Sequence, residues 1–352
     1  MFLPMHRSAE SVTIVGGGLA GLTLGIGLRQ RGVPVVVWEA GHLPRHRVCG
    51  EFISGTGQRA LDRLGLLDRF RATGACSAAA KVTFFTETTR IAARTLPEPA
   101  LCISRLTLDD WLAQEFQKLG GELRFGARWT GPCGGGVVRA SGRRAAQEAR
   151  GWRLFGLKAH ARNVELEGDL EMHLLPLGYV GLCRLAGGEV NVCGLFRTDT
   201  KLPNLARNWR GWLGGPEGSM LRSRLKDARF DEGSFCAVTA LSLRPMSATD
   251  RSECCVGEAL TMIPPVTGNG MSMAFESAEL AIEPLVGFSR GDLNWEEARR
   301  TIAASCDRRF AARLRHASWL QWGLFHPIGR AILGSLVARS NSFWVGAFQA
   351  TR

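Results

Sequence analysis

The segment from Ser11 to Glu39 constrains the fold most strongly, because it joins a strand, a glycine loop, a helix and a second strand. Residues 11–15 (SVTIV) predict a buried parallel strand, which runs directly into the sequence GGGLAG at 16–21. Apolar residues then recur at helical spacing as far as Gly32, and a second apolar strand over 33–38 ends at Glu39. This order of elements predicts an α/β, Rossmann-like dinucleotide-binding domain with a parallel sheet covered by helices.

The glycines of this loop have separate physical roles. Gly16 permits the tight turn, Gly18 lets the backbone approach a pyrophosphate, and Gly21 lets the helix pack closely on the strand. The start of the helix offers free N–H groups and a partial positive charge to the phosphates. A carboxylate at Glu39 fits an unphosphorylated adenosine ribose, hence FAD or NAD rather than NADP. The predicted cofactor-binding residues of this segment are Gly16, Gly18, Leu19, Ala20, Gly21, Glu39 and Ala40.

Composition excludes several classes of protein. The 352 residues suggest two domains or one large one, and 45% hydrophobic with 22% charged residues is typical of a globular chain. The net charge of +12 comes from scattered arginines without a basic run, so we expect no nucleic-acid partner. The sequence has no apolar run of about 18 residues and no apolar segment at its start. We therefore expect a cytoplasmic protein without a membrane-spanning helix.

The cysteines and histidines do not form a metal or disulfide pattern. Ten cysteines are spread from Cys49 to Cys306 without a CxxC pair. The seven histidines do not cluster with them at the spacing of zinc sites. We expect reduced thiols and no metal.

Three further segments favour FAD over NAD through their resemblance to a known family. Residues 47–54 (RVCGEFIS) resemble the segment after the second strand in the geranylgeranyl-reductase-like branch of the FAD-dependent monooxygenase (aromatic hydroxylase) superfamily. Residues 103–112 (ISRLTLDDWL) resemble the superfamily's arginine-then-helix segment, which implies that Arg105 approaches the flavin or its diphosphate. The resemblance also implies contacts to the cofactor from Arg47 and Cys49, the cysteine lying near the flavin ring.

The third segment, residues 255–271, resembles the superfamily's GD…P…GxG block. Its acid would bind the ribityl chain of FAD, and its glycine loop would begin a helix, predicted from Met271 to Ala281, beneath the flavin ring. The start of that helix would stabilise the negative charge that appears on the flavin when it is reduced. Two positions depart from the family pattern, since Glu258 and Ser141 stand where aspartate is usual. The implied cofactor-binding residues are Gly257, Glu258, Pro265, Gly268, Asn269, Gly270 and Met271.

The sequence between these segments predicts a second, mostly antiparallel β-sheet domain, and the resemblance implies that this sheet covers the flavin and binds the substrate. Residues 81–96 read as a strand pair, and the turns at 176–178 and 187–188 predict hairpins within 152–196. We assign 1–80, 97–150 and 240–290 to a discontinuous FAD-binding domain, and 81–96 with 151–239 to the sheet domain. Residues 291–352 form a C-terminal helical segment.

The sequence predicts fewer catalytic residues than cofactor-binding residues, and fewer observations support each of them. Cys49 is a candidate proton donor, because the resembling reductases have a cysteine there, with a small buried side chain as the alternative. His160 and Lys158 lie on a strand entering the sheet, where either is a general acid or a solvated side chain. Tyr179 is the only tyrosine, and a structural role at a strand end competes with a catalytic one.

The arginine-rich C-terminal helices offer alternative partners. Apolar residues interspersed with arginine suit a helix on a membrane surface, while packing over the substrate opening or into a dimer are the alternatives. The overall interpretation is an FAD-dependent oxidoreductase for a small apolar or carrier-bound organic substrate, with NAD(P)H as a transient electron donor. A monooxygenase of secondary metabolism, a reductase of carbon–carbon double bonds and a non-catalytic FAD- or lipid-binding protein are the hypotheses. The WxWxIP motif of flavin halogenases is absent.

Overall fold

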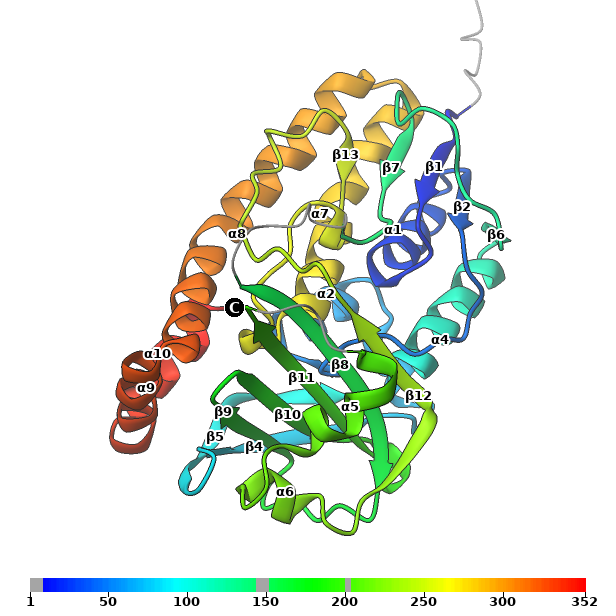
Figure 1. Cartoon of the computed structure of the whole chain (residues 1–352). Helices are drawn as coiled ribbons and strands as arrows, with labels where there is room; N and C mark the ends of the chain where they lie inside the picture. The colour runs from blue at the N-terminus through cyan, green and yellow to red at the C-terminus, as the bar shows by residue number, and fades with distance from the viewer. Residues whose placement is uncertain (1–8, 144–151, 200–203) are drawn as a thin grey trace, which may run out of the picture.

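The computed structural model describes residues 9–143, 152–199 and 204–352, which form two β-sheets and a set of helices (Figure 1). The first sheet has the strand order β13-β7-β1-β2-β6, and all of its pairs are parallel. Its central strands, β1 and β2, are short, largely buried and rich in valine, as in sheets covered by helices. Their bounds are β1 (Val12–Val15), β2 (Val35–Glu39), β6 (Glu122–Phe125), β7 (Val137–Arg139) and β13 (Cys254–Cys255).

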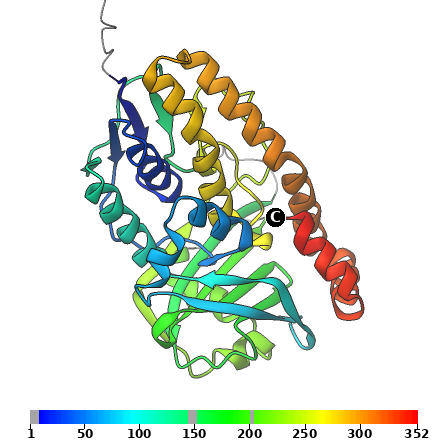
Figure 2. The same ribbon diagram turned by 180° about the vertical axis from the view of Figure 1, so that it is seen from behind.

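Helices α1 (Leu19–Arg29), α4 (Arg105–Lys118) and α7 (Gly270–Arg290) pack against one another beside this sheet (Figures 1 and 2). A side chain at Gly25 would meet the ring of Phe116 at 2.8 Å, so glycine is needed for α1 and α4 to approach. Helix α7 begins as predicted but runs nine residues beyond Ala281, to Arg290, because apolar side chains continue to face the core. Helices α2 (Gly55–Arg63) and α3 (Leu67–Arg71) complete this layer.

The second sheet has the order β12-β8-β11-β10-β9-β4-β5-β3 and is antiparallel except where β4 pairs with β9. The hairpins predicted at 176–178 and 187–188 are confirmed, since β9–β10 and β10–β11 pair directly. Helices α5 (Leu205–Gly214) and α6 (Met220–Arg224) cover the outer face. The strands are β3 (Phe52–Ile53), β4 (Ser77–Phe85), β5 (Arg90–Cys102), β8 (Arg153–Arg162), β9 (Leu170–Leu175), β10 (Gly178–Arg184), β11 (Val190–Thr198) and β12 (Arg229–Val238).

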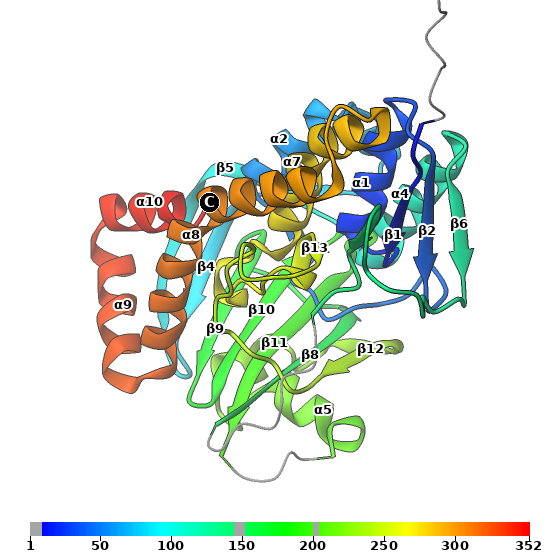
Figure 3. The same ribbon diagram turned by 90° about the horizontal axis from the view of Figure 1, so that it is seen from above.

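The C-terminal segment is helical, as predicted, and folds back along both sheets (Figure 3). It contains α8 (Trp295–Phe325), α9 (Pro327–Arg339) and α10 (Asn341–Ala350). Asn294 caps the start of α8 in a capping box. Pro327 is the first residue of α9, a position where the backbone N–H has no partner within the helix, so proline loses no hydrogen bond there. The Trp344 indole N–H donates to the carbonyl of Thr95 at 2.8 Å, which fixes α10 to β5.

The two-sheet α/β fold with a helical C-terminal segment is therefore the fold predicted from the sequence. Among the described residues no helix combines the length and the apolar character needed to cross a bilayer. The boundaries assigned to the two domains stay a prediction, and part of the stretch between β7 and β8 lies outside the described residues. Three short 3-10 helices, Ala186–Gly188, Gly257–Ala259 and Pro265–Thr267, complete the described elements.

Candidate FAD and substrate site

A large cavity of about 1090 Å³ lies between the parallel sheet, the inner face of the second sheet and the C-terminal helices. This volume is at the upper end of small-molecule sites. The structure brings most of the predicted cofactor residues into its wall, whereas Gly21 and Asn269 lie behind it. The lining set is Gly16, Gly18, Leu19, Ala20, Glu39, Ala40, Arg47, Cys49, Arg105, Gly257, Glu258, Pro265, Gly268, Gly270 and Met271.

The turn between β1 and α1 forms one end of the cavity. Gly16 has a φ of +117°, and a side chain there would lie 2.5 Å from the carbonyl oxygen of Ala140. At Gly21 a side chain would lie 1.9 Å from the carbonyl oxygen of Gly16, so this glycine serves helix packing. Gly18 differs from both, since no atom lies within 4 Å of the position its Cβ would take. The backbone at Gly18 therefore faces open space in which a phosphate group fits.

Glu39 closes this end and holds the loop. Its Oε2 accepts a hydrogen bond from the N–H of Gly17 at 2.9 Å, and its Oε1 accepts from Gly41 at the same distance. Arg45 donates to Oε1 at 2.7 Å. Burial raises the pKa of the Glu39 carboxyl, but these hydrogen bonds and the Arg45 charge more than offset it, so the net shift is downward. A charged carboxylate at the end of β2 suits an adenosine ribose.

Buried N–H groups in the wall support a bound group at this end. The indole N–H of Trp129 and the Nε of Arg45 are buried, line the cavity and find no hydrogen-bond partner among the described residues. Since buried donors are almost always paired, their acceptors are expected on a ligand. The residues present therefore fit the dinucleotide part of FAD.

Replacing Glu39 with alanine is expected to weaken FAD retention by about tenfold or more, because a charge-assisted hydrogen bond contributes about 1.5–3 kcal/mol. Glu39→Gln is the matched variant, since its amide oxygen still accepts from Gly17 or Gly41 and keeps part of the loop's support. FAD dissociation constants measured by titrating the apoprotein check this. Equal FAD affinity in the alanine variant and the natural protein would exclude a ribose role for Glu39.

The start of α7 forms the other end of the predicted FAD site. Gly268 has a φ of +63°, and Asn269 precedes the helix without capping it through its side chain. The Asn269 side chain instead accepts from Ser54 at 2.7 Å and donates to the carbonyl of Thr351, so it ties the C-terminal segment to this loop. Gly270 and Met271, the first residues of α7, line the cavity, so the start of this helix lies at its wall.

Glu258 and Ser141, the two departures from the family pattern, both line the cavity. The Glu258 carboxylate lies 3.8 Å from the Arg143 guanidinium and is partly exposed. The longer acid is thus part of a loose ion pair at the cavity wall. Its predicted contact with the ribityl chain stays a prediction.

Arg105 lines the middle of the cavity but is firmly held. Its Nε and Nη2 donate to the two carboxylate oxygens of Asp109 at 2.7 and 2.8 Å, and Arg47 Nε lies 3.4 Å from the same carboxylate. Burial lowers the pKa of Arg105, but the Asp109 charge overcomes this and the net shift is upward. The side chain is a fixed, permanent positive charge beside Cys49.

Cys49 presents a thiol to the cavity. Burial raises its pKa, and the nearby Arg105 charge only partly opposes this. Asn191 donates to the Cys49 carbonyl at 2.9 Å, which fixes the backbone at this point. The group is therefore a protonated thiol at neutral pH, which agrees with a proton donor or a small wall residue and not with a nucleophilic thiolate.

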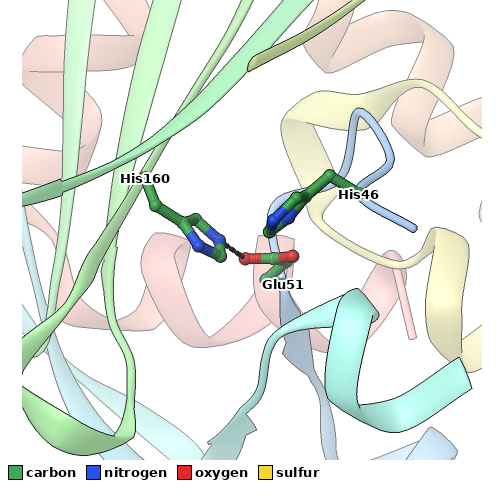
Figure 4. Close-up of side chains that lie close together, drawn as sticks. All are labelled: His46, Glu51 and His160. Atoms are coloured by element: carbon green, nitrogen blue, oxygen red, sulfur yellow. Dashed lines mark hydrogen bonds and ion pairs between the residues drawn. The ribbon is translucent and has the colours of Figure 1, made fainter. Parts of the chain in front are cut away.

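His160, the other predicted catalytic residue, lies behind the cavity wall beside buried Glu51 and half-buried His46 (Figure 4). Lys158, which is also buried, belongs to the same cluster. His160 Nε2 lies 2.6 Å from Glu51 Oε2, and Lys158 Nζ lies 3.6 Å from Glu51 Oε1. Lys158 also donates to His46 Nδ1 at 2.9 Å. Glu51 and His46 line the cavity whereas His160 does not, so the catalytic role of His160 stays a prediction.

Three members of this cluster could together hold a metal ion by position. Ligand atoms of His46, Glu51 and His160 lie within 4.8 Å of one another. The Lys158 ammonium already contacts His46 and faces Glu51, and it supplies the positive charge that a metal would bring. The arrangement is better explained as a hydrogen-bonded ion cluster, and the expectation of no metal stays a prediction.

Apolar side chains from the second sheet and the C-terminal helices enclose the remaining part of the cavity. Tyr179 lies in this wall, and its hydroxyl donates to Gln321 of α8 at 3.1 Å, so the phenol is held by the helix. Of the alternatives that the sequence left open for the C-terminal helices, packing over the substrate opening agrees with this wall. The wall includes Leu174, Tyr179, Leu195, Leu320, Leu324, Leu333, Val337, Trp344 and Phe348.

The fold and the cavity together define an FAD-binding protein, and comparison with known proteins agrees. Residues 9–146 match the family described as FAD binding domain. Monooxygenase 1 of Arabidopsis thaliana is 33% identical over 117 residues, which span 33% of this chain and 29% of that protein. The chain therefore carries an FAD binding domain over residues 9–146, and the prediction of FAD as the cofactor is confirmed.

Solved structures share the fold over nearly the whole chain. The flavin-dependent brominase Bmp2 superposes with a TM-score of 0.74 at 17% identity, covering 97% of this chain and 93% of its own. Halogenase PltM gives 0.71 at 15% identity over 98% and 86%. P. aeruginosa PqsL, solved in complex with 2-aminobenzoylacetate, gives 0.69 at 16% identity over 92% and 98%. At these identities the likeness is one of fold.

Proposed function

We propose that this protein is an FAD-dependent monooxygenase that acts on a small apolar organic compound of secondary metabolism. The observation that carries the proposal is the continuity of one cavity from the glycine loop at Gly18 to the apolar wall at Leu324. Bound FAD would supply the redox chemistry, taking electrons from a donor such as NAD(P)H and activating oxygen when reduced. A cofactor and a substrate bound in this cavity would share one space, which the second sheet closes off.

The residues of this chain would contribute binding, charge and exclusion of water. The helix starts at Gly18 and Gly270 direct partial positive charge into the cavity, where phosphates and a reduced flavin carry negative charge. Arg105 adds a fixed cation held by Asp109. The apolar wall would bind the substrate by burial of its hydrocarbon surface and keep water from the reacting atoms.

A reductase of carbon–carbon double bonds is the second candidate, and the Cys49 thiol favours it. A double bond that accepts a hydride also needs a proton, and a protonated thiol in the cavity wall is able to donate one. Cys49 also lies in the segment 47–54, which resembles the corresponding segment of the geranylgeranyl-reductase-like branch. A Cys49→Ser variant would then lose most reductase activity while keeping its FAD.

Absorption and oxygen uptake test the proposal. The purified protein is expected to be yellow, with flavin bands that bleach on reduction, and to consume oxygen faster in the presence of an apolar aromatic or polyketide substrate. Anaerobic saturation of a substrate double bond without oxygen uptake would establish the reductase instead. A protein that retains FAD but shows neither reaction would be a non-catalytic FAD- or lipid-binding protein. A colourless protein that takes up no FAD would overturn the assignment altogether.

A further inference from the structure

Helices α8 and α9 carry large apolar side chains that nothing in the described chain covers. Trp319 and Trp322 of α8 are 80% and 69% exposed, and Ile328, Ile332 and Leu336 of α9 are 66%, 55% and 38% exposed. The α9 residues recur every four positions and so share one face of the helix. These five residues, named here the α8–α9 apolar surface, lie on two helices that pack against each other. Exposed apolar groups gathered in this way mark an interaction site.

Packing of the core does not explain this surface, because the same helices have a separate apolar face inside. Leu320 and Leu324 of α8 and Leu333 and Val337 of α9 line the cavity. Both sides of the helical pair are thus apolar, one toward the cavity and one toward solvent. A helix that only closes a cavity needs a single apolar face.

The charge of this region is one-sided. Residues 308–352 contain seven arginines and no aspartate or glutamate. Four of these arginines bind within the chain: Arg309 and Arg313 contact Glu276, and Arg330 and Arg352 donate to backbone carbonyls. Arg308, Arg315 and Arg339 are exposed on the same helices. The α8–α9 apolar surface therefore lies in a positively charged segment, residues 308–352, that contains no acidic residue.

We propose that the α8–α9 apolar surface docks peripherally on an anionic lipid bilayer. Tryptophan prefers the interface between headgroups and acyl chains, and arginine places its stem against apolar surface while its charge meets phosphate. Anionic headgroups are complementary to the acid-free, arginine-rich segment. The turn between α8 and α9 lies at one end of the molecule, opposite β6, where it can reach a flat surface (Figures 1 and 3).

A second copy of the chain fits this surface less well. A symmetric dimer buries the same patch from both subunits, so Arg315 and Arg339 of each copy would approach those of the other. Like charges brought together without acids oppose such an interface.

Docking on a bilayer would also place the helices that wall the cavity at the membrane, where an apolar substrate dissolves. The docking itself does not depend on the reaction catalysed.

Flotation of the FAD-loaded protein with lipid vesicles tests this proposal. We expect binding to vesicles of phosphatidylcholine mixed with phosphatidylglycerol, weakened by salt, and little binding to phosphatidylcholine alone. The double substitution Trp319→Ser with Trp322→Ser is expected to abolish flotation. Neutralising Arg315 and Arg339 with glutamine is expected to weaken binding by about fivefold per residue. The control is Phe125→Ser, an exposed aromatic on β6 at the opposite end.

Unchanged flavin spectra and melting temperatures will show that the variants are folded, since every substituted side chain is exposed. Binding that the control retains and the tryptophan variant loses supports the proposal. Equal binding to neutral and anionic vesicles, or flotation unaffected by the tryptophan and arginine substitutions, overturns it. A concentration-dependent dimer that dissociates in the tryptophan variant also overturns it, because the surface would then belong to a second copy.

Discussion

Replacing Gly18 with alanine is expected to weaken FAD binding by about 10- to 100-fold while leaving the stability of the apoprotein nearly unchanged. No atom lies within 4 Å of the position the new methyl would take, so the apoprotein accommodates it. The same methyl would occupy the space in which the pyrophosphate approaches the backbone. Loss of a hydrogen bond from a backbone N–H to a charged phosphate costs about 1.5–3 kcal/mol, which corresponds to this range of affinity.

Gly21→Ala is the matched substitution, because it adds the same methyl group to the same helix with the opposite consequence. Its Cβ would lie 1.9 Å from the carbonyl oxygen of Gly16, so the helix must move away from the turn. Overpacking of this kind costs about 1–3 kcal/mol or more. We expect a lower urea midpoint for the Gly21→Ala apoprotein and an unchanged midpoint for Gly18→Ala.

Urea unfolding of the apoproteins, followed by circular dichroism, and FAD titrations of both variants separate the two effects. If Gly18→Ala binds FAD as tightly as the natural protein, the phosphates do not lie against this glycine. If it lowers the urea midpoint as much as Gly21→Ala, the position serves packing instead.

The dinucleotide half of this protein was predictable because its information is local. The glycine spacing at 16–21 and the acid at Glu39 lie within one strand–helix–strand unit, and each residue type is required by backbone geometry there. The structure accordingly places both at one end of the cavity. The hairpin turns of the second sheet are equally local, and they were also predicted correctly.

The buried polar cluster and the helical wall were not predictable in the same way, because their contacts join distant parts of the chain. His46 and His160 are 114 positions apart, and only the packing of β8 against the loop after β2 brings them together. Glu51 lies in the segment 47–54, where the family resemblance implied cofactor contacts from Arg47 and Cys49 but no role for Glu51. Helix α7 runs past its predicted end at Ala281 and continues through Pro284, because its later apolar side chains also pack in the core.

Replacing Glu51 with glutamine is expected to lower the free energy of unfolding by about 3–5 kcal/mol, the usual cost of removing one partner from a buried ion pair. Glu51 is fully buried and lies between His160 at 2.6 Å and Lys158 at 3.6 Å. Glu51 Oε1, the oxygen that faces Lys158, also accepts a hydrogen bond at 2.8 Å from the backbone N–H of Arg105 at the start of α4. Glutamine keeps the size and the φ of +58°, so the change removes charge without altering the backbone.

The double variant Glu51→Gln with Lys158→Met isolates the ion pair. Without the charge of Glu51, the Lys158 ammonium is left buried without that counter-ion, and methionine removes the positive charge at similar volume. We expect the double variant to be more stable than Glu51→Gln alone, a non-additivity that urea unfolding of the apoproteins measures. Strictly additive losses would mean that the carboxylate acts through His160 and the α4 start rather than through Lys158.

The pH dependence of stability is an independent test of how much the charge of Glu51 stabilises the fold. Burial raises the pKa of Glu51, but the hydrogen bond from His160 and the Lys158 charge lower it more, and the net shift is downward. A carboxyl whose pKa is depressed by folding stabilises the protein fully above its unfolded value of about 4.3, and this contribution is lost as the pH falls toward the folded value. The difference in urea midpoint between the natural protein and Glu51→Gln should therefore be constant near neutrality and shrink below about pH 4.3. A difference that persists undiminished at acidic pH would show that the charge of Glu51 is not what stabilises the contact between the second sheet and the FAD-binding half.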